Sequence, residues 1–432
     1  MKRVKVPIHL ALFICIFLPE ITFADSESTL NLKYKYGQIQ LLPSLKSDSG
    51  IEYSGTKMYS DLWAEYSVKI SEKISFDAAV EVTDQPHQLI GTNYSRPDYP
   101  ITTGRVQRSV VRYATNSFAA SFGRDDMLKE ALRPRVFQYP ASGDGFSWKY
   151  HWNKWHFKHV FQILPAEEEN TQVFRRSISY HHLSRVINNF TLGVGEYFIL
   201  TGHQIGFDLK RLNPFIPYFV NSFDSKPDIY PGFEGDSDNS LIKLFLSWGK
   251  NTSQVSLSLY VDEFQIDAAD REVFNDAMLL SLSAINELEL FGHINEINWG
   301  FSASNPNFGQ HPGPFTTTSF AVYPLFEYTP GMKQLVFVET KTPVGESFHL
   351  FLGGYSERWV NIAQLTPELM NKRIELDLLK VYSDSRLSVG FEYDLKNYPL
   401  KIGSTGWVGS GTNSSSGFLL NLQFNRNSNP KR

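Results

Sequence analysis

Apolar and polar residues alternate along much of the chain, and this period-two pattern predicts β-strands. The first clear example has apolar residues at Leu62, Ala64, Tyr66, Val68 and Ile70, with polar or charged residues between most of them. After Ser71-Glu72-Lys73 the alternation resumes over residues 74–83. Because successive side chains of a strand point to opposite faces, the two segments predict a hairpin with one apolar and one polar face.

The same pattern continues to the end of the chain. Residues 146–152 and 155–161 alternate around Asn153-Lys154, and residues 255–261, 387–395 and 418–424 alternate in the same way. Many of these segments end on aromatic residues and carry charges on their polar face. Strands that are apolar toward lipid and polar toward a lumen, with aromatic girdles, are typical of outer-membrane β-barrels. The pattern therefore predicts an all-β fold, a transmembrane barrel of antiparallel strands.

The first 24 residues have the composition of a cleaved secretory signal. Lys2, Arg3 and Lys5 precede an apolar run over residues 8–18, and small residues at Thr22 and Ala24 flank Phe23 before the expected cut. We therefore predict a signal peptide at 1–24 and a single barrel domain at 25–432. Export followed by insertion of a barrel predicts the outer membrane of a Gram-negative cell as its location.

Length and composition limit the other possibilities. The 408 residues after position 24, at very roughly 23–25 residues per strand, predict about 16–18 strands. Aromatic residues at 14% and charged residues at 20% exclude a disordered chain. A net charge of −4 gives no electrostatic reason to expect nucleic acid as a partner, and the single cysteine excludes a disulfide framework.

Several segments interrupt the alternation. Residues 126–132, which precede Pro134, predict a short helix, and residues 268–285 match a helical period beginning near Asp270. The stretches 84–104, 221–240, 302–317 and 403–417 are rich in Gly, Pro or Asn and are predicted to be loops. The glycines of the last stretch, at 403, 406, 409 and 411, are interpreted as a flexible loop.

A resemblance to a known family lies in the middle of the chain. The matching pieces are His181-His182-Leu183, Asn189 to Glu196, Leu212-Asn213-Pro214, Asp238-Asn239-Ser240, Leu259 to Phe264 and, upstream, Phe122-Gly123-Arg124. In this order and spacing they resemble the Wzi-type capsule-assembly family of bacterial outer-membrane proteins. The resemblance implies a monomeric barrel whose lumen is plugged by loops and short helices, and a lectin-like function without catalysis. The family-motif positions expected to act structurally are His182, Glu196, Asn213, Pro214, Asp262, Glu263 and Phe264.

Catalytic and metal-binding patterns are weak. His156 and His159, and likewise the adjacent His181 and His182, would face opposite sides of a strand and would not share an ion. We therefore expect no metal and no cofactor. Glu196, Asp262 and Glu263 are open to two interpretations: catalytic carboxylates in a lumen, or structural acids paired with arginines there, because unpaired buried charge is costly. We favour the structural interpretation.

Residues in the predicted loops have the chemistry that sugars need. Aromatic rings offer an apolar face, and neighbouring amides, carboxylates and guanidinium groups offer hydrogen bonds. The candidates for polysaccharide contact are Tyr94, Arg96, Tyr99, Phe233, Phe308 and Trp407. For any one aromatic, an interfacial girdle or loop packing is the competing interpretation.

Three functions remain open from the sequence. The first is a barrel that binds and anchors surface polysaccharide, with polysaccharide and outer-membrane lipid as partners. The second is a porin for small solutes, which requires an open lumen. The third is a barrel enzyme acting on lipid or glycan, for which no complete set of catalytic residues is found.

Overall fold

The computed structural model describes most of the predicted strands and a few connections. The described residues are 27–41, 55–83, 103–128, 143–169, 172–202, 238–250, 253–263, 277–290, 292–305, 308, 319–320, 323–324, 333–360, 381–395, 400–411 and 416–428. The predicted signal peptide lies outside these residues.

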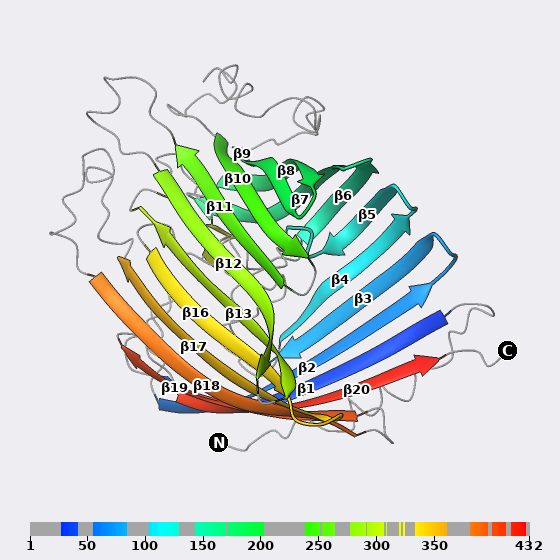
Figure 1. Ribbon diagram of the computed structural model, residues 1–432. Coiled ribbons are helices and arrows are strands. Elements are labelled where there is room, and N and C mark those ends of the chain that lie inside the picture. Colours follow the sequence, from blue (N-terminus) through cyan, green and yellow to red (C-terminus); the bar gives the residue numbers. More distant parts are fainter. Residues whose placement is uncertain are drawn as a thin grey trace.

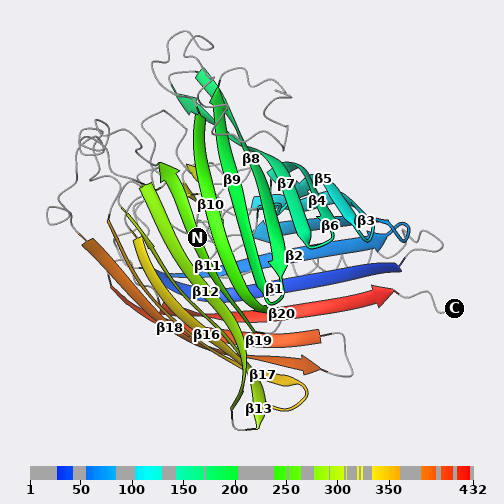
Figure 2. The ribbon, with the colours of Figure 1, turned by 45° about the horizontal axis from the view of Figure 1, so that its top comes forward.

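Eighteen strands within the described residues form one sheet (Figures 1 and 2). They are β1 (Glu27–Leu41), β2 (Gly55–Lys69), β3 (Ile74–Thr83), β4 (Thr103–Ala114), β5 (Phe118–Asp125), β6 (Gly143–Trp152), β7 (Trp155–Glu169), β8 (Gln172–Ile187), β9 (Phe190–Gly202), β10 (Asp238–Lys250), β11 (Ser253–Glu263), β12 (Ala277–Leu290), β13 (His293–Ser304), β16 (Lys333–Pro343), β17 (Phe348–Val360), β18 (Val381–Leu395), β19 (Leu400–Gly411) and β20 (Ser416–Ser428). A separate two-stranded sheet joins β14 (Ser319–Phe320) to β15 (Tyr323–Pro324). The count agrees with the predicted 16–18 strands.

Each strand of the large sheet pairs antiparallel with the next strand along the chain. The first strand also pairs with the last, so that Ser28 lies opposite Ser428 and Leu32 opposite Phe424. Figure 2 shows β1 and β20 side by side. This pairing joins the first and last described strands and completes a ring of strand pairs, so that none of the eighteen described strands of the large sheet has an unpaired edge.

Short and long connections alternate around the ring. Two to four residues link β2 to β3, β8 to β9 and β16 to β17, whereas 35 residues follow β9 and 20 follow β17. Because consecutive strands run in opposite directions, the short links gather at one end of the sheet and most of the long ones at the other. This asymmetry is typical of outer-membrane barrels, whose longer loops are extracellular.

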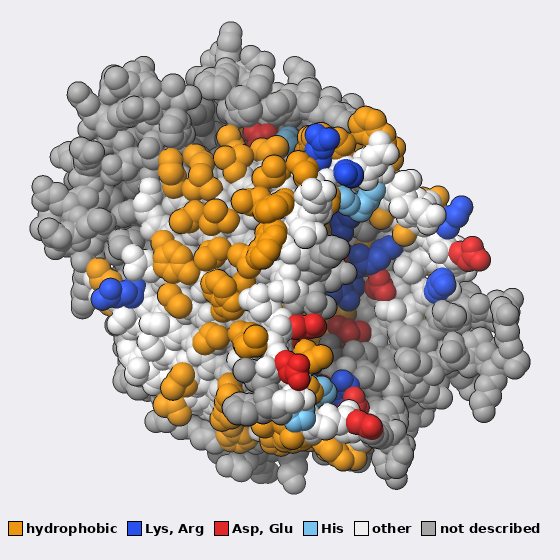
Figure 3. Space-filling view, viewed as in Figure 1, with side chains coloured by type: hydrophobic (Ala, Val, Ile, Leu, Met, Phe, Trp, Pro, Cys, Tyr) orange, Lys and Arg blue, Asp and Glu red, His pale blue; other side chains and the backbone are white. Residues whose placement is uncertain are grey.

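The two faces of the ring differ in polarity. Residues opposite each other on paired strands lie on the same face, and Leu183, Val194 and Leu244 form one such row. They are 40%, 45% and 49% exposed, and Figure 3 shows apolar side chains covering much of this face. The opposite face carries many buried apolar residues and many of the paired charges, such as Arg112 and Asp77. We call the apolar face the outward face and the other the inner wall.

The structure confirms the predicted hairpins and their faces. In β2 and β3 the outward residues include Leu62, Tyr66 and Val80, whereas Asp77 and Glu65 lie on the inner wall. The predicted turn at Asn153-Lys154 joins β6 to β7, and Asn153 adopts a positive φ of 52°.

Two predictions about local structure are wrong. Residues 277–285, the latter part of the predicted helix at 268–285, belong to strand β12 (Ala277–Leu290), because Leu280 and Leu282 also alternate with Ser281 and Ser283. Pairing with β11 and β13 satisfies the backbone hydrogen-bonding groups along this segment, and this favours the strand period over the helical period. Residues 264–276 lie outside the described residues.

The glycine-rich stretch 403–417 is not one loop. Its first part belongs to β19, and Ser416 begins β20. Glycine by itself weakens a strand, but backbone pairing with the neighbouring strands holds these residues in the sheet. The loops predicted at 84–104, 221–240 and 302–317 likewise have strand residues at their described ends, in β4, β10 and β13.

The predicted helix at 126–132 begins with a turn over Met127 and Leu128, and its remainder lies outside the described residues. No helix in the described part of the chain is long and apolar enough to cross a membrane.

Candidate functional site

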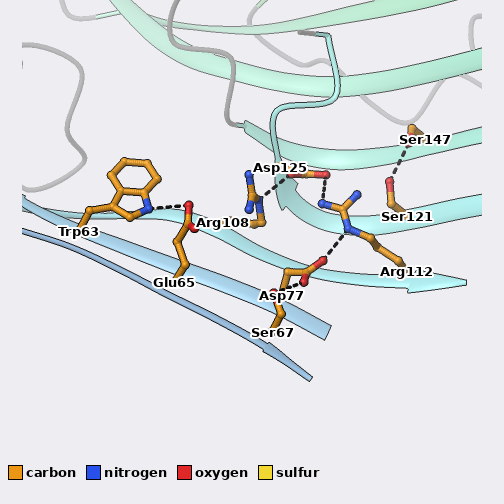
Figure 4. A network of polar contacts seen from close by, with 9 residues as sticks. All are labelled: Trp63, Glu65, Ser67, Asp77, Arg108, Arg112, Ser121, Asp125 and Ser147. Atoms are coloured by element: carbon orange, nitrogen blue, oxygen red, sulfur yellow. Dashed lines mark hydrogen bonds and ion pairs between the residues drawn. The ribbon is translucent and has the colours of Figure 1, made fainter. Parts of the chain in front are cut away.

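A network of paired charges lies on the inner wall of β3, β4 and β5. Arg112 connects two carboxylates: its Nε lies 2.7 Å from Oδ2 of Asp77, and its Nη2 lies 2.6 Å from Oδ2 of Asp125. Arg108 Nε donates to Oδ1 of Asp125 at 3.1 Å. Figure 4 shows these side chains converging from neighbouring strands. The network therefore joins three strands through their side chains as well as their backbones.

The same wall continues this polar pattern on both sides. Ser67 donates its hydroxyl to Asp77 at 2.6 Å, and Trp63 donates its indole N–H to Glu65 at 2.7 Å. Gln107 also donates to Glu81 across a β-bulge in the β3–β4 pair. Carboxylates held by cations and hydroxyl donors in this way are suited to a structural role.

Another part of the inner wall is apolar and covered. Met127 and Leu128, which follow β5, and Phe308, which follows β13, belong to one buried cluster with side chains from the inner wall. Its other members are Val160, Leu164, Ile178, Tyr180, Tyr197, Ile199, Leu241, Tyr260, Leu279, Leu335 and Phe337. Lys158 Nζ donates to the carbonyl oxygen of Met127 at 2.8 Å. Connecting segments thus fill part of the interior, although the described residues that do so form no helix.

A third part of the inner wall combines aromatic and charged groups. The guanidinium of Arg386 lies 4.5 Å from the ring centroid of Trp407, and Lys341 Nζ lies 5.5 Å from that of Phe351. Further along β18 and β19, Lys401 Nζ lies 3.2 Å from Glu392 and 3.3 Å from Asp394. Aromatic faces beside charged groups suit a sugar or another polar solute.

Glu196 does not face the lumen, which corrects the prediction made from the sequence. Glu196 lies opposite His181, and His181 is two residues from Leu183 on the same strand. Since Leu183 is on the outward face, the side chains of His181 and Glu196 are on the outward face as well. Their Oε2 and Nε2 atoms are 3.1 Å apart, and Glu196 is 5% exposed. His159, opposite His181 on β7, is completely buried on the same face. A partner of Glu196 within the described residues is therefore a histidine.

Two of the proposed sugar-contact residues are not on loop surfaces. Trp407 lies within β19 on the inner wall and is 8% exposed, and Phe308 is 1% exposed inside the apolar cluster. Loop-like composition alone did not reveal this packing. The other candidates for sugar contact, Tyr94, Arg96, Tyr99 and Phe233, lie outside the described residues.

The structure describes three of the six remaining family-motif positions. His182 lies on the inner wall, where its ring centroid is 4.8 Å from that of Phe245. Asp262 and Glu263 end β11, where the register shifts between Val261 and Glu263. Asn213, Pro214 and Phe264 lie outside the described residues.

Sequence reasoning missed the arginines of the charge network. Arg108 and Arg112 are four residues apart on one strand, an even spacing that places both side chains on the same face. That signal was present in the sequence, but the partner Asp125 was not identifiable without the pairing of β4 with β5. Within the strands and turns described, no group of three or more His, Cys, Asp or Glu side chains is arranged to hold a metal ion.

A ring of antiparallel strands with an apolar outward face and a charged, partly filled interior defines a class of protein. The chain has the fold of the outer-membrane β-barrels.

No protein-family model and no curated protein matches the sequence. Among solved structures, the chain is similar to Wzi of Escherichia coli, an outer-membrane protein involved in group 1 capsule assembly and a carbohydrate-binding β-barrel. The TM-score is 0.54 at 10% identity, covering 90% of this chain and 84% of that chain. The outer-membrane protein OpdK of Pseudomonas aeruginosa has a TM-score of 0.53 at 10% identity, covering 94% and 99%. At such identities the likeness shows the fold alone.

Proposed function

We propose that this protein is an outer-membrane barrel that binds surface polysaccharide, capsular or exopolysaccharide, and helps to hold it on the cell. The binding is noncovalent and lectin-like, and no catalytic step is involved. The protein acts as a monomer in the outer membrane of a Gram-negative cell, after export directed by residues 1–24.

The observation that carries this proposal is the filled part of the interior. Met127, Leu128 and Phe308 bring apolar side chains from two connections onto the inner wall. An apolar cluster of this kind narrows the route for water and ions, which favours a binding protein over an open channel. Similarity to Wzi and the Wzi-like motifs between His181 and Phe264 support the same function.

The proposed contacts with polysaccharide come from the long connections at one end of the ring. Tyr94, Arg96, Tyr99 and Phe233 belong to the 19-residue connection between β3 and β4 and the 35-residue connection between β9 and β10. Aromatic rings stack on the apolar faces of sugars, and arginine forms charge-assisted hydrogen bonds with acidic sugars. Local arginines are needed because the chain as a whole is acidic and would repel an anionic polymer.

A diffusion channel for small solutes is the second candidate. The paired charges of Arg108, Arg112, Asp77 and Asp125 line the inner wall, and a polar wall is what a solute pathway needs. OpdK is as similar in fold as Wzi.

Deleting the gene separates the two functions. Cell-bound and shed polysaccharide are measured in the deletion strain, in the strain complemented with the wild-type gene, and in a strain carrying Tyr94→Ala, Arg96→Ala and Tyr99→Ala together. We expect unchanged total synthesis with a shift toward shed material in the deletion and triple-variant strains. An unchanged distribution in the deletion strain contradicts the proposal, and single-channel conductance of the purified barrel then tests the second function.

A further inference from the structure

An open groove runs along the outward face of β16–β19. It has two adjoining parts, with volumes of about 450 Å³ and about 760 Å³, which share Val338, Gly354, Leu387 and Val408. These four residues lie opposite one another in a single row across the four strands. The groove is therefore a feature of the sheet itself.

Glycines create the groove. Gly354 lies between Val338 and Leu387, and Gly406 lies beside Val389 in the next row. The side chains around these glycines project freely: Leu387 is 73% exposed and Val408 is 70% exposed. The missing side chains leave a depression between apolar walls on a face that is already apolar.

One end of the groove has a different chemistry. In the row next to Leu387, the outward residues of β17, β18 and β19 are Ser356, Ser385 and Ser410, and these lie opposite one another. Ser385 donates its hydroxyl to Ser356 at 3.0 Å. This serine row lies on the side where 20 residues connect β17 to β18, which is the end of the ring with the longer connections.

The arrangement matches a lipid acyl chain in shape and polarity. From the serine row to the row of Gly406 the strands rise about 13 Å, which is the length of a medium acyl segment. In a bilayer, hydroxyl groups facing hydrocarbon need partners, because no water is present to satisfy them. A chain with a hydroxyl or amide group near its head supplies such partners to the serines, while its apolar part covers the glycines.

We propose that this groove binds one hydroxyacyl chain of an outer-leaflet glycolipid, with its polar head toward the serine row. The proposal rests on the outer-membrane location given under the proposed function. A second copy of the chain fits less well. Its partner surface would have to be apolar over the apolar rows and polar only at the serine row, a pattern that a single acyl chain with a hydroxyl group near its head has by itself. The groove continues the apolar outward face that Figure 3 shows.

The test is native mass spectrometry of the whole chain, purified from outer membranes in mild detergent and then mixed with purified lipid A or with dipalmitoyl phosphatidylethanolamine. Gly406→Leu fills the groove, because a Cβ at Gly406 meets only the Gly417 carbonyl oxygen, at 3.9 Å. Ala78→Leu places the same side chain on the outward face of β3, away from the groove, and is the matched control. Ser356→Ala, Ser385→Ala and Ser410→Ala together remove the hydroxyl row. Heat-modified gel migration verifies that each variant folds.

We expect lipid A to remain bound to the wild type and to Ala78→Leu, and its affinity to fall at least about tenfold in Gly406→Leu and in the triple serine variant. Binding that Gly406→Leu leaves unchanged overturns the proposed groove. Equal binding of phosphatidylethanolamine, or a mass corresponding to two chains without lipid, overturns the proposed ligand. Polysaccharide retention is measured separately in the same variants, so unchanged lipid binding together with normal retention counts against this inference and leaves the proposed function standing.

Discussion

Arg112 and Asp77 join β4 to β3 on the inner wall, with Nε of the arginine 2.7 Å from Oδ2 of the carboxylate. The same guanidinium contacts Asp125 on β5 at 2.6 Å. Removing Arg112 therefore takes away the guanidinium that pairs with Asp77 in a partly enclosed interior. It also takes away one of the two arginines that pair with Asp125.

We expect Arg112→Ala to lower the free energy of unfolding by about 1–3 kcal/mol, since its side chain is 37% exposed and the pairs are only partly desolvated. Urea unfolding of the barrel in lipid vesicles measures the change. Arg124→Ala is the matched control, because its partner Asp144 is 56% exposed and the pair lies on the outward face. Equal losses in the two variants would contradict a special role for the inner network.

Phe308, which follows β13, packs against the inner wall. Phe308→Ala removes a buried aromatic side chain, and substitutions of this type lower the free energy of unfolding by about 3–5 kcal/mol. We expect the connection to loosen and the single-channel conductance of the purified barrel in planar bilayers to rise. Phe301→Ala, on the outward face of β13 and 38% exposed, is expected to leave conductance unchanged. No rise in Phe308→Ala would show that the apolar cluster does not narrow the pathway.

The pair of His181 and Glu196 is buried on the outward face. Glu196→Ala removes the carboxylate that His181 contacts at 3.1 Å, and we expect a loss of about 1–3 kcal/mol in unfolding free energy. Glu72→Ala, in the exposed turn between β2 and β3, is the control and is expected to stay within about 0.5 kcal/mol of the wild type. Similar values for both variants would mean that the histidine finds another acceptor.

Gly123 has a backbone conformation that other residues rarely adopt, with φ at +124°. An added Cβ would stand 2.2 Å from the Ser109 carbonyl oxygen of β4. We expect Gly123→Ala to lose more than about 2 kcal/mol of stability or to fail to assemble into the folded, heat-modifiable form.

Gly292 provides the comparison for Gly123. Its φ is also positive, at +76°, but nothing lies within 4 Å of an added Cβ. Gly292→Ala is expected to cost about 1 kcal/mol, from backbone conformation alone. Equal effects in the two variants would remove the steric explanation for Gly123.

The sequence by itself determined the strand content, the approximate strand number and the polarity of the two faces. The strand number follows from the length of the chain. Strand content and the polarity of the faces follow from period-two alternation, which is local: Leu62 and Ala64 share a face of β2 whatever strand lies beside them. The hairpin turn at Asn153-Lys154 was also predictable, since it depends only on neighbouring residues.

Only the tertiary structure decided which side chains meet. Residues 277–285 fit both a helix and a strand, and pairing with β11 and β13 selected the strand. The burial of Phe308 and Trp407, the contact of Arg112 with Asp125 and the position of Glu196 on the outward face depend on register between strands and on the packing of connections inside the ring. Because a shift of one residue in register exchanges the two faces, no local pattern fixes these contacts without the pairing of the whole sheet.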